Sequence, residues 1–138
     1  MTTRLAQTLA SLAESGHLLG RLTLDQQPLP SPVARAVAVL RAEGPMGVSA
    51  LARRCHMAQS TMTEIVQEAE AAGWMRRQGA GMRLRIMATH AGTLALAQQR
   101  DVVGAALEPR FKHLAQRERA VLERAALILA SGLARDAD

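Results

Sequence analysis

The sequence predicts a mainly α-helical fold with one small β-hairpin, and three observations lead to this prediction. Apolar residues recur at helical spacing along most of the 138 residues. Directly after Gly73 the apolar pattern changes from the helical period to strict alternation. Prolines and glycines punctuate the pattern, as in QQPLPSP (26–32) and Gly44-Pro45. The length suits a single domain, and a hydrophobic content of 49% is enough to form a core.

Two helices are predicted in the first part of the chain. Leucines three and four positions apart indicate a long amphipathic helix over residues 4–24. The prolines of segment 26–32 end it, because proline lacks a backbone N–H and clashes with the preceding turn. Ser31 and Pro32 fit the N-cap and first position of a second helix. The buried stripe of this second helix is predicted to be Val33, Val37 and Leu40.

Two shorter helices are predicted next. Ser49 is a favourable N-cap for a third helix over residues 50–55, because its hydroxyl can accept a hydrogen bond from a free amide of the first turn. A fourth helix is expected over 59–72, where Gly73 stops it. The inward face of the fourth helix is predicted to hold Met62, Ile65, Val66 and Ala69.

An alternating pattern over residues 74–87 predicts a two-stranded hairpin with its tip at 78–81. In the second arm Arg83 and Arg85 share one face, and the apolar residues that alternate with them share the other. This is the pattern of a half-buried strand.

Two more helices are predicted after the hairpin. Thr89 caps a fifth helix that runs to about Leu107, and Pro109 kinks or breaks it. The last helix is expected over about 116–133. A short helix, a tight turn, a second helix and a hairpin together make a helix-turn-helix with a wing, which we place at residues 32–90.

The charge distribution favours a polyanionic partner. Lys and Arg number 17 against 12 Asp and Glu, which gives a net charge of +5. The excess positive charge is concentrated in residues 49–88, which contain six arginines and three glutamates, a net charge of +3. Tyrosine is absent and Trp and Phe occur once each, so the chain cannot supply the row of aromatic platforms on which single strands stack. Double-stranded DNA is therefore the expected partner.

Two segments resemble MarR-type transcriptional regulators. They are VSALARRCHMAQSTMTEIVQEAEAAGWMRR (48–77) and IMATHAG (86–92), and the helices around them fit that family in number and order. The resemblance implies one MarR-like domain over 1–138 that forms a homodimer and represses transcription from a palindromic operator until a small aromatic or phenolic effector releases it. It also implies dimerisation helices at 1–30 and 105–138 and a connecting helix at 89–108.

The same resemblance supplies the candidate DNA-binding residues. Serine 49 and the amide end of the third helix are expected at phosphate, and the start of the fourth helix is expected at base edges. Arginines of the hairpin are expected at its base and at phosphates. The full set is Ser49, Arg53, Arg54, Gln59, Ser60, Thr61, Thr63, Arg76, Arg77, Arg83 and Arg85.

The sequence departs from the family pattern at the fourth helix. Ala58 stands where a capping serine or threonine is usual, so we expect the cap to shift to Gln59 or Ser60. Glu64 stands where a basic residue is common, and Glu68 follows one turn later. Phosphates repel a carboxylate, although glutamate can accept a hydrogen bond from cytosine N4.

The wing is also shorter than in the family. Residues 80–82 (Ala-Gly-Met) stand in place of a segment whose tip arginine enters the minor groove. These departures leave an alternative open, in which a MarR-like protein with a weakened DNA surface acts as a protein-interaction or antirepressor module.

The effector site is predicted at His17, Arg21 and Met46. His17 and Arg21 lie one helical turn apart and could bind a carboxylate, and the alternative is a structural role.

Cys55 is the single cysteine, which excludes an internal disulfide and fits a reducing compartment, so we expect a cytoplasmic protein. A buried, apolar role is the favoured interpretation of Cys55. The alternative is redox sensing, with Arg53, Arg54 and His56 lowering its pKa.

Several classes of function are not expected. The four histidines and the cysteine lack metal-ligand spacing, so no metal and no cofactor are predicted. No nucleophile stands with a base and no phosphate loop is present, which argues against an enzyme. No apolar run approaches the roughly 18 to 20 residues that span a bilayer, so no membrane partner is predicted.

Overall fold

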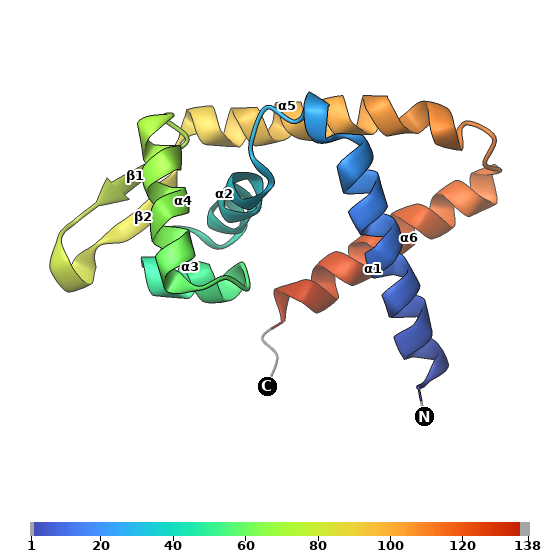
Figure 1. The fold of residues 1–138 in the computed structure, drawn as a ribbon, viewed down its shortest axis with the longest axis horizontal. Helices are drawn as coiled ribbons and strands as arrows, with labels where there is room; N and C mark the ends of the chain where they lie inside the picture. Colours follow the sequence, from blue (N-terminus) through green and yellow to red (C-terminus); the bar gives the residue numbers. More distant parts are fainter. Residues whose placement is uncertain (1, 136–138) are drawn as a thin grey trace. The chain divides into compact units, whose positions relative to one another are not determined.

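A computed structural model describes residues 2–135 (Figure 1). It confirms the mainly α-helical fold with one hairpin. In chain order the elements are α1 (Arg4–Leu22), α2 (Ser31–Glu43), α3 (Val48–Arg54), α4 (Gln59–Ala71), β1 (Met75–Gln78), β2 (Arg85–Ala88), α5 (His90–Leu107) and α6 (Gln116–Ala134). The chain divides into two compact units, one ending at Leu107 and the other beginning at Glu108.

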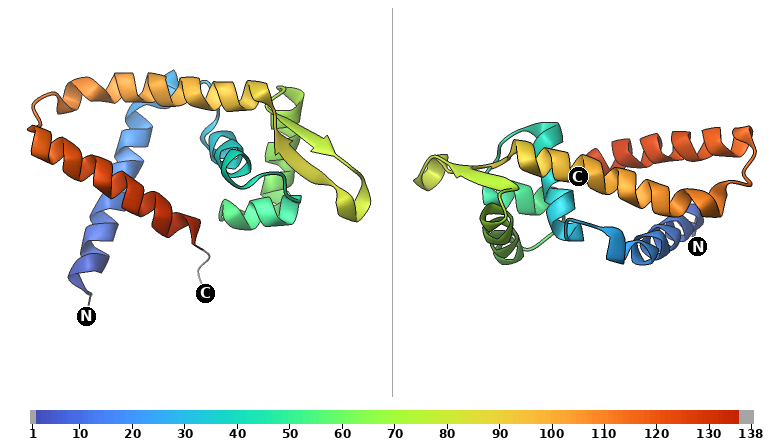
Figure 2. Two further views of the ribbon diagram at one scale, coloured as in Figure 1. Left: turned by 180° about the vertical axis from the view of Figure 1, so that it is seen from behind. Right: turned by 90° about the horizontal axis from the view of Figure 1, so that it is seen from above.

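The core of the first unit lies among α2, α3, α4, the hairpin and the first half of α5 (Figures 1 and 2). The predicted inward faces of α2 and α4 are confirmed. In each helix the buried residues recur mainly three and four positions apart. This spacing places them on one side of a helix with 3.6 residues per turn. These buried residues are Val33, Val37 and Leu40 of α2 and Met62, Ile65, Val66 and Ala69 of α4. Leu51, Met75 and Ile86 complete the core from α3 and the two strands.

The structure corrects the predicted starts of α2 and α3. Helix α2 begins at Ser31 with Pro30 as its N-cap, so Pro32 lies one position further inside the first turn. Proline is tolerated there, because the first amides of a helix have no acceptor within it. Helix α3 begins at Val48 with Gly47 as its N-cap, and Ser49 is not the cap. The carbonyl of Gly47 accepts the first helical hydrogen bond, from the Leu51 amide (3.0 Å).

Helix α1 is amphipathic as predicted but ends at Leu22, and a short 3-10 helix follows at Leu24–Gln26. Thr23 between them is buried, and its hydroxyl donates to the carbonyls of Leu19 (3.2 Å) and Gly20 (3.1 Å). Helix α1 itself has no buried residue. Leu19 is half-buried, and the other five leucines of α1 are exposed: Leu5, Leu9, Leu12, Leu18 and Leu22.

The two strands pair antiparallel, from Met75 opposite Ala88 to Gln78 opposite Arg85. The second strand is shorter than predicted, because Gly81–Arg83 forms a 3-10 turn and the strand begins only at Arg85. Arg83 therefore lies at the tip and does not share a strand face with Arg85.

The wing tip depends on Gly79. Its φ of +86° is a left-handed conformation that side chains rarely adopt, and a Cβ there would lie 2.6 Å from the Arg83 carbonyl oxygen. The tip can therefore close only over a glycine at this position.

Thr89, which follows β2, forms hydrogen bonds to the start of α5 and to the chain just after α4. Its Oγ1 accepts a hydrogen bond from the Gly92 amide (3.0 Å), which is the predicted cap, and donates to the Gly73 carbonyl (2.6 Å). A side chain at Gly92 would collide with the Trp74 carbonyl, so only glycine fits. The Thr-x-x-Gly spacing of IMATHAG thus has a structural cause.

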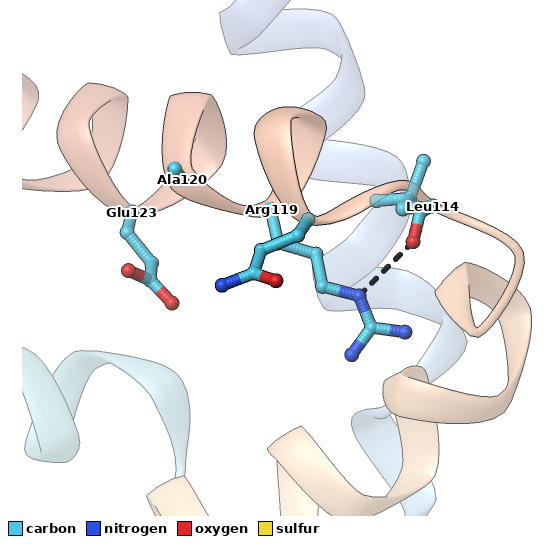
Figure 3. Close-up of a pocket in the computed structure, with 5 residues that line it drawn as sticks. Leu114, Arg119, Ala120 and Glu123 are labelled. Carbon is cyan, nitrogen blue, oxygen red and sulfur yellow. Dashed lines mark hydrogen bonds between the residues drawn. The ribbon is translucent and has the colours of Figure 1, made fainter.

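The second unit consists of a 3-10 helix, Glu108–Phe111, and α6. Pro109 lies in this break between helices, as predicted. Arg119 fixes the turn before α6, donating to the carbonyls of Leu114 (3.1 Å, Figure 3) and Lys112 (3.0 Å). Like α1, α6 buries no residue within this chain, and it exposes Val121, Leu122, Leu127, Ile128 and Leu133.

Candidate nucleic-acid interface

The outward face of α4 is polar, and the side chains at its centre make no contact with polar groups of the described chain. At about 100° per residue, Ser60, Glu64 and Gln67 lie opposite the buried face of this helix. All three are exposed. Within residues 2–135 none of their side chains forms a hydrogen bond or an ion pair. The centre of this face is therefore free to bind another molecule, and we call these three residues the outer stripe.

The first turn of α4 is only partly free. Ala58 is its N-cap and makes no side-chain hydrogen bond, so the expected shift of the cap to Gln59 or Ser60 is wrong. The side chain of Gln59 is engaged, since its Oε1 accepts a hydrogen bond from Ser49 Oγ (2.8 Å). Thr63 is half-buried, and its hydroxyl donates back to the Gln59 carbonyl (2.9 Å). Of the four predicted base-reading residues, Ser60 and Thr61 remain exposed and unbonded among the described residues.

The arginines of the predicted set differ in whether their side chains already form ion pairs or hydrogen bonds within the chain. Arg53 at the end of α3 and Arg83 at the wing tip are exposed and have no partner among residues 2–135. Arg54 forms an ion pair with Glu43 (2.6 Å). Arg53 and Arg83 can therefore bind a phosphate without first breaking a contact within the described part of the chain.

Two of the remaining hairpin arginines, Arg77 and Arg85, make contacts that stabilise the hairpin. Arg77 pairs with Glu70 of α4 (3.7 Å), and Glu70 also accepts from the Arg77 amide (3.2 Å). Arg85 donates to the carbonyls of Met82 (3.3 Å) and Leu84 (3.1 Å), which holds the tip in shape. Among the described residues, the one polar partner of the Arg76 side chain is the sulfur of Met87 (3.6 Å). All three guanidinium groups lie on exposed residues.

The turn between α3 and α4 is tight and internally tied. His56 has a φ of +56°, a left-handed conformation that lets the chain reverse between the two helices. Arg35 of α2 reaches this turn and donates from Nη1 to the Cys55 carbonyl (3.4 Å). The position of α2 and the position of the turn are therefore linked by a side chain.

Cys55 itself is fully buried, as the favoured interpretation expected. Burial raises the pKa of its thiol, Arg35 lowers this pKa in part, and Glu43 raises it further. The neighbours expected to lower the pKa of the thiol, Arg53, Arg54 and His56, are not among these causes. A buried thiol with a raised pKa lacks the thiolate character that redox sensing needs.

A groove of about 490 Å³ runs between α2 and α5. Two arginines, Arg35 and Arg100, line it together with the apolar side chains of Leu96 and Val103. The buried Gln99 also lines the groove, and its side-chain oxygen accepts a hydrogen bond from the Leu29 amide (2.8 Å). A groove with two cations and apolar walls suits a small organic anion.

The predicted effector residues do not line this groove. His17 and Arg21 are exposed on α1. Met46 supports the wing: its amide donates to the Ile86 carbonyl (3.2 Å) and its carbonyl accepts from the Ile86 amide (2.7 Å). The structure therefore does not bring these three residues together around the groove.

Three residues of this surface and groove were not predicted from the sequence: Gln67, Arg35 and Arg100. Gln67 follows Ser60 and Glu64 at spacings of four and three, so extension of the outward stripe by one turn would have found it. Arg35 and Arg100 carried no signal, because their proximity depends on how α2 packs against α5.

Neither a metal site nor a membrane span is found in the described part of the chain. No group of three or more His, Cys, Asp or Glu side chains among residues 2–135 could hold a metal ion. None of the helices described is long and apolar enough to cross a bilayer.

A tight turn between two helices, a polar outward face on the second helix and a hairpin beside it define a winged helix-turn-helix protein. Residues 29–79 match the sequence model of the MarR family. The resemblance predicted from the sequence is thereby confirmed, and the fold is that of MarR-family structures.

Solved structures resemble the chain over nearly its full length. A MarR family protein from Bacillus stearothermophilus is 24% identical, with a TM-score of 0.73 over 95% of this chain and 94% of that one. RV1404 from Mycobacterium tuberculosis is 18% identical, with a TM-score of 0.75 over 100% of both chains. Wild-type MarR from E. coli is 15% identical, with a TM-score of 0.70 over 94% of this chain and 98% of that one. A search of curated proteins returned no significant match.

Proposed function

We propose that this protein is a transcriptional regulator that binds double-stranded DNA through α4 and the wing. One observation carries the proposal: Ser60 and Thr61 in the first turn of α4 are exposed, and Arg53 on α3 and Arg83 at the wing tip lie in the same unit. The side chains of all four have no hydrogen bond or ion pair with oxygen or nitrogen atoms of the residues that the structure describes. Short hydroxyl side chains at the start of a helix suit base edges, and arginines suit phosphates. The match to the MarR family supports the same function.

The active form in this proposal is a homodimer. Helices α1 and α6 each present a row of apolar side chains that this chain leaves exposed. Contact with a second copy would remove these side chains from water, at about 25 cal/mol per Å² of apolar area. Residues 1–30 and 105–138 are thus proposed as dimerisation helices, with 32–90 as the winged helix-turn-helix and 89–108 as the connecting helix of one MarR-like domain.

Dimer symmetry determines the kind of DNA site. Two copies of α4 related by a two-fold axis read two half-sites of opposite direction, so the operator is palindromic. Binding there represses transcription in the cytoplasm, without any enzymatic step.

Release by a small effector completes the proposal. The groove between α2 and α5 offers Arg35 and Arg100 to the carboxylate of an aromatic or phenolic acid. Arg35 also bonds to the Cys55 carbonyl in the turn before α4 (3.4 Å), so a ligand that attracts Arg35 acts on the DNA-binding motif.

Selection of duplexes from a random library tests the function. The full-length protein is expected to enrich a palindromic sequence, and the Ser60→Ala/Thr61→Ala variant is expected to lose that enrichment while it keeps its fold. Gln98→Ala, at an exposed polar position on α5 outside the proposed DNA surface and dimer interface, provides the control. Failure of the wild-type protein to enrich any sequence would refute sequence-specific binding.

A second candidate function is favoured by the exposure of Glu64 and Glu68 on α4. Carboxylates on this face would suit a basic protein partner, and the protein would then act as an interaction or antirepressor module. In that case no duplex would bind in a salt-sensitive manner, whereas DNA binding weakens steeply with salt.

A further inference from the structure

Glu64 lies at the middle of the outer stripe, one turn after Ser60 and one turn before Gln67. It is exposed, and its carboxylate has no partner among residues 2–135. By contrast, the carboxylate of Glu70 on the same helix is paired with Arg77. Glu64 is therefore an acidic side chain without a structural partner in the described part of the chain, on the face of α4 that would meet the major groove.

A carboxylate in this place restricts what the helix can bind. It is repelled by phosphates, and when ionised it can only accept hydrogen bonds. A duplex site that suits Glu64 must therefore present a donor to it. In the major groove the donors are the N4 amine of cytosine and the N6 amine of adenine.

Cytosine suits the carboxylate better than adenine does. The N6 amine of adenine stands beside the N7 acceptor, whose lone pair opposes a second carboxylate oxygen. The N4 amine of cytosine has a C–H on its other side, which does not repel. Guanine and thymine present acceptors of their own at this depth and would reject Glu64.

We infer that Glu64 is a specificity-determining residue that accepts a hydrogen bond from cytosine N4 in each half-site. The inference rests on the proposed DNA-binding function and adds the identity of one base pair to it. Ser60 and Gln67 are then in position to contact the neighbouring base pairs, because they lie one turn to either side of Glu64 on the same stripe.

Duplex selection with three forms of the full-length protein tests this role. Wild type is expected to require cytosine at one position of each half-site. Glu64→Ala is expected to lose that preference, by roughly 5- to 150-fold in relative affinity for the cytosine-containing duplex, as for other direct base contacts. Glu68→Gln, which removes a charge one turn away, is the matched control and is expected to select the wild-type sequence. Circular dichroism checks that each variant is folded, and alanine at an exposed helical site favours the helix.

Modified bases test the contact atom. N4-methylcytosine replaces the groove-facing N4 hydrogen by a methyl group, whereas 5-methylcytosine leaves both hydrogens in place. Wild type is expected to bind the N4-methylcytosine duplex more weakly than the unmodified duplex, by the roughly 5- to 150-fold that the cytosine contact contributes. Glu64→Ala is expected to bind these two duplexes equally well. The 5-methyl duplex is expected to retain the N4 contact.

The outcomes separate this inference from the proposed function. If Glu64→Ala selects the same cytosine as wild type, or if N4-methylation leaves wild-type affinity unchanged, Glu64 does not read cytosine although the protein still binds DNA. If wild type binds no duplex at all, the proposed function fails, and this inference fails with it.

Discussion

The hydroxyl of Ser49 in α3 donates a hydrogen bond to the side-chain oxygen of Gln59 in α4, over 2.8 Å. Both residues were predicted to contact DNA, yet in the folded chain they bind each other. The bond joins the first turn of α3 to the first residue of α4. It therefore orients the start of the helix that carries the outer stripe.

The first prediction concerns this bond. Ser49→Ala and Gln59→Ala are each expected to lower the free energy of unfolding by about 0.5 kcal/mol, the low end for a hydrogen bond, since the bond is exposed. Urea denaturation measures the loss. The double variant is expected to be no less stable than either single variant, because each removes the same interaction. Additive losses would show that the two side chains act independently.

The second prediction concerns Arg83, the exposed arginine at the wing tip. Arg83→Ala is expected to reduce the slope of log affinity against log salt by about 0.9, the contribution of one phosphate contact. Arg83→Lys keeps the charge and is expected to keep the slope. Equal slopes for wild type and Arg83→Ala would show that the wing tip does not touch phosphate.

The third prediction concerns Cys55 and pH. Burial raises the pKa of its thiol above that of the unfolded chain, which is about 8.5. Above that pH the unfolded chain loses the proton while the folded chain retains it. The free energy of unfolding is therefore expected to fall as pH rises, down to a plateau above the folded-state pKa, and to show no such effect below about pH 8.

Cys55→Ala isolates this effect, because the variant lacks the Cys55 thiol and keeps every other group that titrates in alkali. The stability difference between wild type and the variant is expected to shrink between pH 7 and pH 10 in urea denaturation. A constant difference would mean that the folded-state pKa is not raised. Native Cys55 is also expected to resist alkylation at pH 7.

The fourth prediction concerns the groove between α2 and α5. Arg35→Ala and Arg100→Ala are each expected to weaken binding of benzoate, used as a simple aromatic carboxylate, by about tenfold in calorimetry, since each removes one charged partner. Arg41→Ala, on α2 but outside the groove, is the control. Unchanged binding in both groove variants would place any carboxylate site elsewhere.

The fifth prediction concerns the exposed face of α6. Leu122 is 52% exposed in this chain, and its replacement by glutamate is expected to convert a dimer into a folded monomer in sedimentation experiments. Glu123→Gln, at the next position, is the control and is expected to remain dimeric. A dimeric Leu122→Glu protein would exclude this face from the interface.

Much of the fold could be predicted from the sequence, because hydrophobic periodicity records which side of a helix is buried. Met62 and Val66 were assigned to the core on spacing alone, and both are buried. The starts of α2 and α3 were misplaced by one or two residues. Capping depends on backbone conformation at Pro30 and Gly47 as well as on side-chain chemistry.

The candidate site was harder to predict, because it depends on contacts between distant residues. Arg54 meets Glu43 across a turn, and Arg85 folds back on the wing tip, so neither is as free as its sequence suggested. The 3-10 turn that moves Arg83 to the tip follows from the conformation of the tip glycines. No periodic pattern reports such a turn.

In the proposed function, α4 and the wing bind specific duplex DNA. The most direct test is the affinity of the wild-type protein for its selected duplex and for a shuffled duplex of equal composition, each between 50 and 200 mM salt. We expect a preference of about 10³-fold or more for the selected duplex and a steep loss of affinity with salt for both duplexes. Equal affinity for the two duplexes, or binding that salt does not weaken, would contradict the proposed function.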